Sequence, residues 1–164
     1  MSGFAGVPTV LLIEDNDGDI GLFRIVAEQA GIKLNLRISL DGLTALEALR
    51  TWRENEASAA PALVLVDLNM PRLDGKAFLS AVRADERLCA LPMVVLSSST
   101  DRNDIDRCLK LGANAYVVKP VDFTEFSTKV RQMLGFWLKT CERPAAIGGG
   151  SGGDCCRDLP GTNS

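Results

Sequence analysis

Short apolar runs alternate along the chain with longer stretches in which apolar residues recur every three or four positions. Compact runs rich in Val, Ile and Leu are typical of strands, whereas the longer periodic stretches are typical of amphipathic helices. The strand pattern is found at residues 9–13, 34–40, 63–66, 93–96 and 115–118. A stretch of helical period follows each run, so strands and helices are expected to alternate through five units.

Most of the expected strands are apolar at nearly every position, which indicates that both faces of their sheet are covered. Strands that alternate with helices build a parallel sheet with helices on both sides. We therefore predict a doubly wound α/β sandwich with three layers. Ligands of such sheets bind beyond the carboxyl ends of the strands, so the residues that directly follow the strands are the candidates for chemistry.

The chain of 164 residues carries a formal net charge of −3 and has no histidine. The missing imidazole excludes Ser-His-Asp and Cys-His nucleophile systems, His-ligated zinc or haem, and a phosphohistidine on this chain itself. The basic residues form no stripe, so no nucleic-acid partner is expected. No apolar run approaches the roughly 20 residues that a membrane span needs. The start also lacks a secretory pattern, so we expect a cytoplasmic protein without a membrane partner and with reduced cysteines.

Polar side chains directly follow four of the expected strands. Glu14 and Asp15 follow the first strand, Asp67 the third, Ser97 the fourth and Lys119 the fifth. One interpretation is structural, with carboxylates that only cap helices and start turns. However, two carboxylates about 5 Å apart repel by roughly 3 kcal/mol at an effective dielectric near 20, and one lysine does not neutralise three negative charges. Such a cluster either raises one pKa strongly or recruits a divalent cation.

The candidate ligands in this cluster are all oxygen atoms, which favours Mg²⁺ over metals that prefer Cys or His. A carboxylate beside Mg²⁺ and a lysine, with a hydroxyl opposite, forms a site that can accept a phosphoryl group. In this chemistry Asp67 attacks, while the cation and the Lys119 ammonium stabilise charge on the transferring oxygens. The predicted product is an acyl phosphate on Asp67.

Four fragments, each after an expected strand, resemble the receiver domains of two-component response regulators. They are LLIEDN for the acidic pair, LVLVDLNMPRLDG around the phosphoacceptor, PMVVLSSS for the switch hydroxyl and AYVVKP for the lysine. The resemblance runs from Pro8 to about Leu138 and implies a receiver domain over residues 1–143. It also implies a flavodoxin-like sheet in the order 2-1-3-4-5 with five helices. The family is not enzymatic beyond Mg²⁺-dependent self-phosphorylation and slow self-dephosphorylation.

The resemblance assigns the phosphoacceptor and the metal ligands. It implies that Asp67 is the phosphorylated residue. It further implies that Mg²⁺ is organised by Glu14, Asp15 and Asp67 together with the backbone carbonyl of Asn69. The first acid is Glu rather than the commoner Asp, and the hydroxyl residue is Ser rather than Thr, so fine rates are expected to differ while the chemistry stays the same.

The resemblance also assigns the residues that respond to phosphorylation. Ser97 would hydrogen-bond the phosphoryl group, and Lys119 would pair with it. Tyr116 stands where the family places an aromatic side chain that turns inward when the hydroxyl residue shifts, although a tyrosine half buried at a sheet edge fits the spacing equally well. Pro120 would follow a cis peptide bond, which proline permits at low cost.

The end of the chain predicts how the signal leaves the protein. Residues 144–164 include the run GGGSGG, which is typical of a flexible linker and leaves no room for an effector domain. We therefore expect a single-domain response regulator that signals through its own surface or relays the phosphoryl group onward in a phosphorelay.

Bulky apolar residues near the end of the last expected helix extend beyond one stripe. Trp137 continues the stripe that faces the core, whereas Phe136 and part of the Phe123 side fall off it. The helix end either folds back on its own domain or forms a subunit contact, and a C₂ homodimer would hide Phe123, Phe136 and Trp137. The segment KPVDFTEFSTKVRQMLGFWL resembles single-domain regulators of bacterial and cyanobacterial phytochromes. This resemblance implies a homodimer and a sensor histidine kinase, a bacteriophytochrome, as the phosphoryl donor.

Two other functions remain open. A phosphatase or phosphomutase with an aspartyl intermediate would also use Asp67, but such enzymes need a second acid two residues later, where Asn69 stands, and a cap domain. A constitutive binding scaffold would use the carboxylates only as helix caps and would not respond to Mg²⁺.

Overall fold

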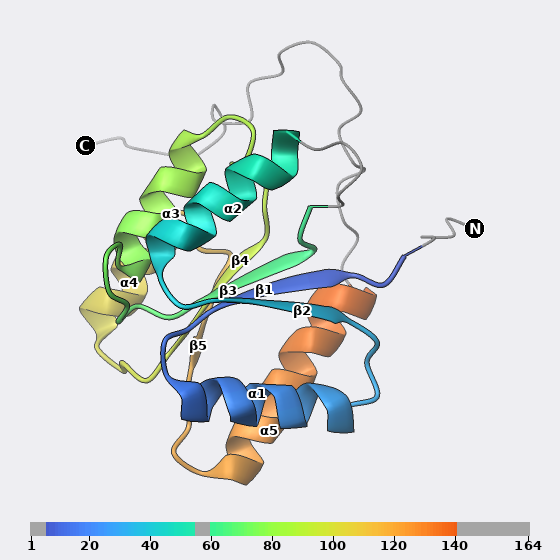
Figure 1. Ribbon diagram of the computed structural model, residues 1–164. Coiled ribbons are helices and arrows are strands. Elements are labelled where there is room, and N and C mark those ends of the chain that lie inside the picture. Colours follow the sequence, from blue (N-terminus) through green and yellow to red (C-terminus); the bar gives the residue numbers. More distant parts are fainter. Residues whose placement is uncertain (1–5, 55–59, 141–164) are drawn as a thin grey trace.

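Five parallel strands form one sheet at the centre of the molecule in the computed structural model, which describes residues 6–54 and 60–140 (Figure 1). The strands lie in the order β2-β1-β3-β4-β5, which confirms the predicted winding. Every neighbouring pair of strands is parallel. The bounds are β1 Thr9–Ile13, β2 Asn35–Ser39, β3 Leu63–Val66, β4 Met93–Ser97 and β5 Ala115–Val118.

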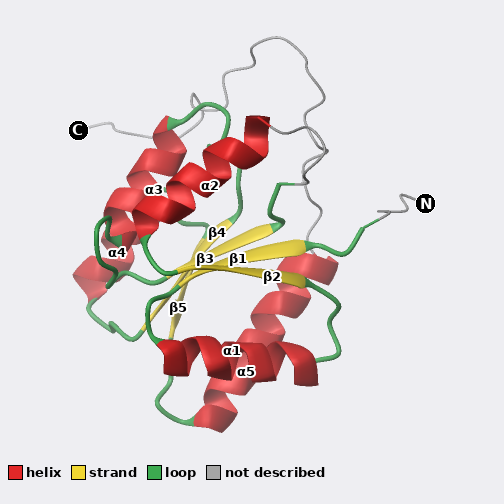
Figure 2. Ribbon diagram, viewed as in Figure 1, coloured by secondary structure: helices red, strands yellow, loops and turns green. Residues whose placement is uncertain are grey.

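Helices cover both faces of this sheet (Figure 2). One face carries α1 and α5, and the opposite face carries α2, α3 and α4. The predicted three-layer sandwich is therefore confirmed. The bounds are α1 Asp17–Gln29, α2 Gly42–Glu54, α3 Gly75–Ala84, α4 Arg102–Lys110 and α5 Phe123–Gly135, and a π-helical segment at Phe136–Thr140 continues α5.

Two hydrophobic cores lie on opposite sides of the sheet, because successive residues of a strand point to opposite faces. In β3, Leu63 and Leu65 face the core between the sheet and helices α1 and α5. Val64 and Val66 face the other core, between the sheet and helices α2 and α3. All four side chains are fully buried. This two-sided burial explains the uninterrupted apolar run in the sequence, and it fixes the strand ends that carry the polar residues.

Polar caps and glycines set the ends of the helices. The Asp41 carboxylate accepts a hydrogen bond from the Thr44 N–H at 2.7 Å at the start of α2, and Asp122 caps α5 in the same manner. Aspartate is a favoured residue at this position because its carboxylate accepts from the free N–H groups of the first helical turn. Gly31 and Gly112 follow α1 and α4 with φ of 64° and 104°, a backbone conformation that glycine adopts without strain.

One backbone prediction is wrong. The peptide bond before Pro120 is trans, as are all the peptide bonds among residues 6–54 and 60–140. A bond before proline prefers the trans form by only about 0.5–1 kcal/mol. Proline at this position therefore permits a cis bond without requiring one.

Some predictions fall outside the described residues. The tail at 144–164 and the first residues of the receiver domain predicted over 1–143 belong to this group. Within the described ranges, no helix combines the length and the apolar character that crossing a membrane requires.

Candidate functional site

Three carboxylates meet at the carboxyl edge of the sheet because β1 and β3 are neighbours. Glu14 and Asp15 directly follow β1, and Asp67 directly follows β3. The Asp67 N–H donates to the Ile13 carbonyl at 3.1 Å, which continues the pairing of the two strands to their ends. One carboxylate oxygen from each acid lies within 4.8 Å of the others. Glu14 and Asp67 are buried, and Asp15 is exposed.

Lys119 reaches this acidic cluster from the end of β5. Its backbone N–H donates to the Ser97 carbonyl at 2.8 Å, which fixes the point from which the side chain starts. The ammonium donates a short hydrogen bond to Glu14, lies 3.0 Å from Asp19 Oδ2 and lies 3.7 Å from Asp67 Oδ2. Its side chain is only 10% exposed, and the ion pairs with Glu14 and Asp67 are shielded from water because those carboxylates are buried as well.

The pKa values of Glu14 and Lys119 are both raised, but by different causes. Burial raises the pKa of Glu14 above its ordinary value, and the hydrogen bond and charge of Lys119 offset this effect only in part. Burial disfavours the charged form of Lys119, but the hydrogen bond to Glu14 and the carboxylates of Asp67 and Asp19 hold its pKa above the ordinary value. The raised pKa of Lys119 reflects the negative charge around its ammonium, whereas that of Glu14 reflects mainly the burial of its carboxyl group.

The donor chemistry of the cluster fits a hard divalent cation. Glu14, Asp15 and Asp67 offer only carboxylate oxygens, the ligands that Mg²⁺ takes, and the exposed position of Asp15 leaves access for water ligands. Asn69 lies two residues beyond Asp67 and lines a pocket beside the cluster. Its carbonyl as a metal ligand stays a prediction.

Ser97 and Tyr116 both form hydrogen bonds with the backbone of Ser99. Ser97 ends β4 and is fully buried, and its hydroxyl accepts a hydrogen bond from the Ser99 N–H at 3.3 Å. The Tyr116 hydroxyl donates to the Ser99 carbonyl at 2.8 Å. Tyr116 itself is partly buried against the core below α2 and α3. The predicted switch residues therefore contact the same loop segment.

Most of this chain matches a known protein family. Residues 10–131 match the family described as the response regulator receiver domain. The chain belongs to this family. The resemblance inferred from the four sequence fragments is therefore confirmed. Response regulator Rcp1 of Synechocystis sp. is 34% identical to this receiver over 137 residues, which cover 84% of this chain and 93% of Rcp1.

Solved structures of other receivers share the fold. The phosphorylated cyanobacterial phytochrome response regulator RcpA has a TM-score of 0.77 at 31% identity, and the match covers 85% of this chain and 100% of RcpA. Response regulator RPA3017, which acts in red light signalling of R. palustris, has a TM-score of 0.78 at 34% identity with coverage of 85% and 100%. Rcp1 in its Mn²⁺-bound form has a TM-score of 0.76 at 33% identity with coverage of 84% and 99%. The flavodoxin-like fold is confirmed.

Asp19 is a site residue of this receiver that the sequence prediction missed. It lies in the first turn of α1, where an acid is expected merely because it favours the helix N-terminus. Its ion pair with Lys119 joins residues that are 100 positions apart. The run DNDGD signals several acids near the strand end, but the sequence does not show which of them a distant lysine reaches.

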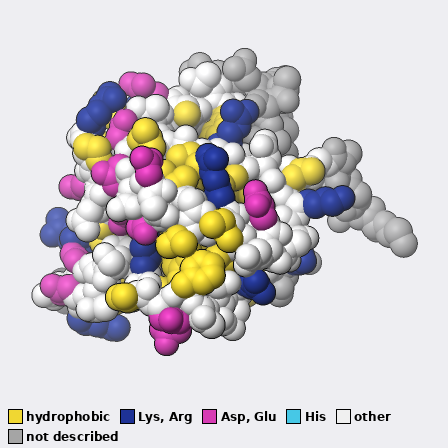
Figure 3. Space-filling model, turned by 60° about the horizontal axis from the view of Figure 1, so that its bottom comes forward, with side chains coloured by type: hydrophobic (Ala, Val, Ile, Leu, Met, Phe, Trp, Pro, Cys, Tyr) yellow, Lys and Arg dark blue, Asp and Glu magenta, His cyan; other side chains and the backbone are white. Residues whose placement is uncertain are grey.

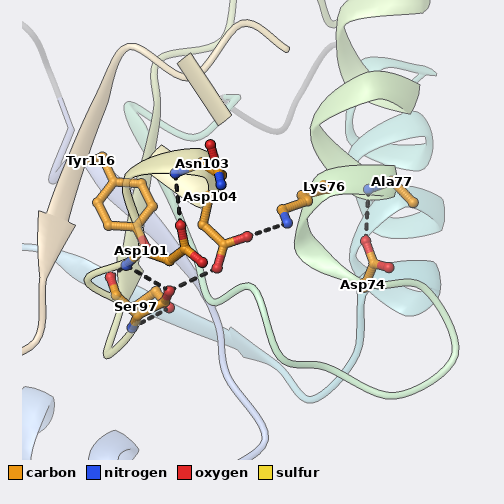
Figure 4. Close-up of polar contacts among 9 residues, drawn as sticks. Asp74, Lys76, Ala77, Ser97, Asp101, Asn103, Asp104 and Tyr116 are labelled. Carbon is orange, nitrogen blue, oxygen red and sulfur yellow. Dashed lines mark hydrogen bonds and ion pairs between the residues drawn. The ribbon is translucent and has the colours of Figure 1, made fainter. Parts of the chain in front are cut away.

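A second missed feature is a polar network that joins α3 to α4 (Figure 4). Lys76 of α3 forms a short ion pair with Asp104 of α4, and the Ser99 hydroxyl donates to the same carboxylate at 2.7 Å. These residues line a pocket of about 270 Å³ that also includes Asn69. The partners come from separate segments, so their spacing carries no signal in the sequence.

The residues predicted at a subunit interface differ in burial. Phe123 and Phe136 are exposed, whereas Trp137 is partly buried against the core below α1 and α5. The rings of Phe136 and Trp137 meet edge to face at a centroid distance of 5.3 Å. The predicted division between a core-facing stripe and outward aromatic residues is thus confirmed, and the homodimer stays a prediction.

Proposed function

We propose that this receiver accepts a phosphoryl group on Asp67 from the phosphohistidine of a partner sensor histidine kinase. The observation that carries this proposal is the position of Asp67. Its carboxylate lies among the oxygens of Glu14 and Asp15 on one side and 3.7 Å from the Lys119 ammonium on the other. A nucleophilic carboxylate between a metal-ligand set and a fixed cation is the arrangement that phosphoryl acceptance requires.

The transfer step uses the side chains in fixed roles. An Asp67 oxygen attacks phosphorus, the new O–P bond forms, and the P–N bond to the donor imidazole breaks. The electron pair of the broken bond stays on the imidazole, which takes a proton from solvent. Lys119 would pair with the phosphoryl oxygens, and the Ser97 hydroxyl would donate to one of them. Mg²⁺ held by Glu14, Asp15 and Asp67 would supply further positive charge at the transferring oxygens.

The donor histidine lies outside these 164 residues, which contain none, and we assign it to a partner kinase. The relatives RcpA and RPA3017 are regulators of phytochrome or red-light signalling by name, which supports a bacteriophytochrome kinase as the donor. We place the exchange in the cytoplasm, where thiols such as those of Cys89 and Cys108 stay reduced.

An apolar surface near the site supports docking of the donor. Hydrophobic side chains gather near the middle of the face that α1 and α5 form (Figure 3). Leu22 and Ile25 are the large exposed hydrophobic residues of α1. Leu22 lies three residues after Asp19 on α1, so it shares the face of the helix that reaches Lys119. A phosphohistidine presented over this surface would face Asp67.

Phosphorylation by a small donor tests the proposal. The full chain is incubated with Mg²⁺ and acetyl phosphate, and its intact mass is measured. The wild type should gain one phosphoryl group and Asp67→Asn should gain none. An unchanged wild-type mass, under conditions that modify another receiver, would contradict the proposal. Continuous release of phosphate from a diffusible phosphoester would instead indicate a phosphatase, and absence of any Mg²⁺ response would indicate a binding scaffold.

We further propose that the receiver forms a homodimer through the last helix. Exposed aromatic side chains are enriched at subunit contacts. Phe123 and Phe136 are exposed in this region, and the Phe136 ring packs edge to face against Trp137. The phosphorylated receiver would then signal through its own surface or relay the phosphoryl group.

A further inference from the structure

Three carboxylates compete for one ammonium group. Lys119 has three N–H donors, and it directs hydrogen bonds to Glu14 and to Asp19 Oδ2, the latter at 3.0 Å. The Asp67 oxygen, at 3.7 Å, lies beyond hydrogen-bond distance. Of the three carboxylates, that of Asp67 therefore interacts most weakly with the Lys119 ammonium.

Asp19 stands apart from the acids that could hold a metal. The group of close carboxylate oxygens consists of Glu14, Asp15 and Asp67. Asp19 projects from α1, and its position there is fixed because its N–H donates to the Asn16 side chain at 3.0 Å. Its side chain is 38% exposed, whereas that of Lys119 is 10% exposed. The partly exposed Asp19 carboxylate thus pairs with the buried Lys119 ammonium from the side of α1.

We infer that Asp19 is a positioning residue, which holds Lys119 on the α1 side of the site until a phosphoryl group on Asp67 takes the ammonium over. The inference rests on the proposed function of Asp67. Before Lys119 can pair with a phosphoryl oxygen, its hydrogen bond to Asp19 has to break or weaken. Asp19 therefore opposes the phosphorylated state and tunes how readily this receiver is switched on.

The inference predicts effects of opposite sign for a cation and for a phosphoryl analogue. Asp19→Asn removes one negative charge, so Mg²⁺ alone should bind more weakly. The same change frees the ammonium, so a tetrahedral anion beside Asp67 should bind more tightly. A merely structural role would weaken both ligands together, because a disturbed α1 N-terminus would disturb the whole site.

Binding of beryllium fluoride, a phosphoryl analogue, provides the test. ¹⁹F NMR measures its occupancy in saturating Mg²⁺, and ¹H–¹⁵N NMR titration measures the affinity for Mg²⁺ alone. For Asp19→Asn we expect beryllium fluoride to bind about threefold to fivefold more tightly and Mg²⁺ to bind about twofold more weakly. Asp19→Glu, which retains the charge, should restore values close to those of the wild type.

Asp17→Asn is the matched control. Asp17 is an exposed acid in the same first turn of α1, and the ion pairs that the structure shows for Lys119 do not include it. Equal effects of Asp17→Asn and Asp19→Asn would assign the change to the general field and overturn the inference, as would weaker binding of both ligands to Asp19→Asn. A wild type that fails to bind beryllium fluoride at all would instead overturn the proposed function itself.

Discussion

The Tyr116 hydroxyl donates a hydrogen bond to the backbone carbonyl of Ser99, 2.8 Å away. This bond connects β5 to the loop after β4, two residues beyond the buried Ser97 hydroxyl. A shift of Ser97 toward a phosphoryl group would move the Ser99 carbonyl and break or bend the bond. The relationship gives the predicted switch a physical connection from the site to the surface of β5.

Removal of this hydroxyl should separate stability from phosphorylation. Tyr116→Phe deletes one partly buried hydrogen bond, so we expect the free energy of unfolding to fall by about 0.5–1.5 kcal/mol. Phosphorylation of Asp67 by acetyl phosphate should persist, because Tyr116 does not contact the carboxylates. Urea unfolding and intact mass measure the two effects. Unchanged stability, or loss of phosphorylation, would contradict this role.

The ion pair between Lys76 and Asp104 should stabilise the receiver in a pH-dependent manner. Hydrogen bonds from Lys76 and Ser99 lower the pKa of Asp104 below its ordinary value of 3.8. A lowered pKa of an acid means that its stabilising effect is present above the ordinary value and is lost as the pH falls through the lowered value. The wild type should therefore be more stable than Asp104→Asn at neutral pH, and the difference should vanish in strong acid.

Asp106→Asn serves as the control for this experiment. Asp106 also lies on α4, but its pair with Arg102 is highly exposed, and pairs of this kind contribute little. Urea unfolding of the wild type and both variants across the acidic range gives the comparison. Equal losses from Asp104→Asn and Asp106→Asn, or a difference that does not depend on pH, would contradict the link between α3 and α4.

Glu14 should reduce the stability of the metal-free receiver while it supports Mg²⁺ binding. Burial raises the pKa of Glu14 above its ordinary value of 4.5. For a raised pKa, the folded state loses stability relative to the unfolded state as the pH rises through the raised value. Glu14→Gln should therefore gain stability over the wild type as the pH rises toward neutrality in EDTA.

Addition of Mg²⁺ should reverse the order of these two proteins. The wild type should gain more unfolding free energy from Mg²⁺ than Glu14→Gln, because the variant lacks one carboxylate ligand. Glu47→Gln on the exposed side of α2 is the control and should follow the wild type in both conditions. An equal Mg²⁺ increment in the wild type and Glu14→Gln would remove Glu14 from the ligand set.

Phe136 should be required for the homodimer. The side chain is exposed, so Phe136→Ala should leave the fold intact, whereas truncation of the partly buried Trp137 would also damage the core. Sedimentation at micromolar concentration should show a dimer for the wild type and a monomer for Phe136→Ala. Leu22→Ala, an exposed apolar residue on α1, is the control. Equal masses for the wild type and Phe136→Ala would exclude this contact.

The sequence predicts the sheet and the acidic cluster because both depend on local patterns. The run from Leu63 to Val66 is apolar at each position since both faces of β3 are covered, and Asp67 follows directly at the carboxyl edge. Parallel neighbours then bring Glu14 and Asp67 together without further information. This is why the strand-end residues were found.

Local patterns do not predict side-chain contacts between distant segments, and they do not predict whether a peptide bond before proline is cis or trans. The bond from Lys119 to Asp19 depends on the side-chain conformation of the lysine and on the helix cap at Asn16, neither of which has a spacing in the sequence. The trans bond before Pro120 reflects a small energy difference that the local residues do not decide.

The central claim is that Asp67 receives the phosphoryl group, and site mapping tests it most directly. The full chain is incubated with Mg²⁺ and the phosphorylated histidine domain of a bacteriophytochrome kinase, then reduced with borohydride, which converts an aspartyl phosphate to homoserine. Peptide mass spectrometry then locates the product. We predict homoserine at position 67 in the wild type and none in Asp67→Asn. Homoserine at another aspartate, or transfer that persists in Asp67→Asn, would contradict the account.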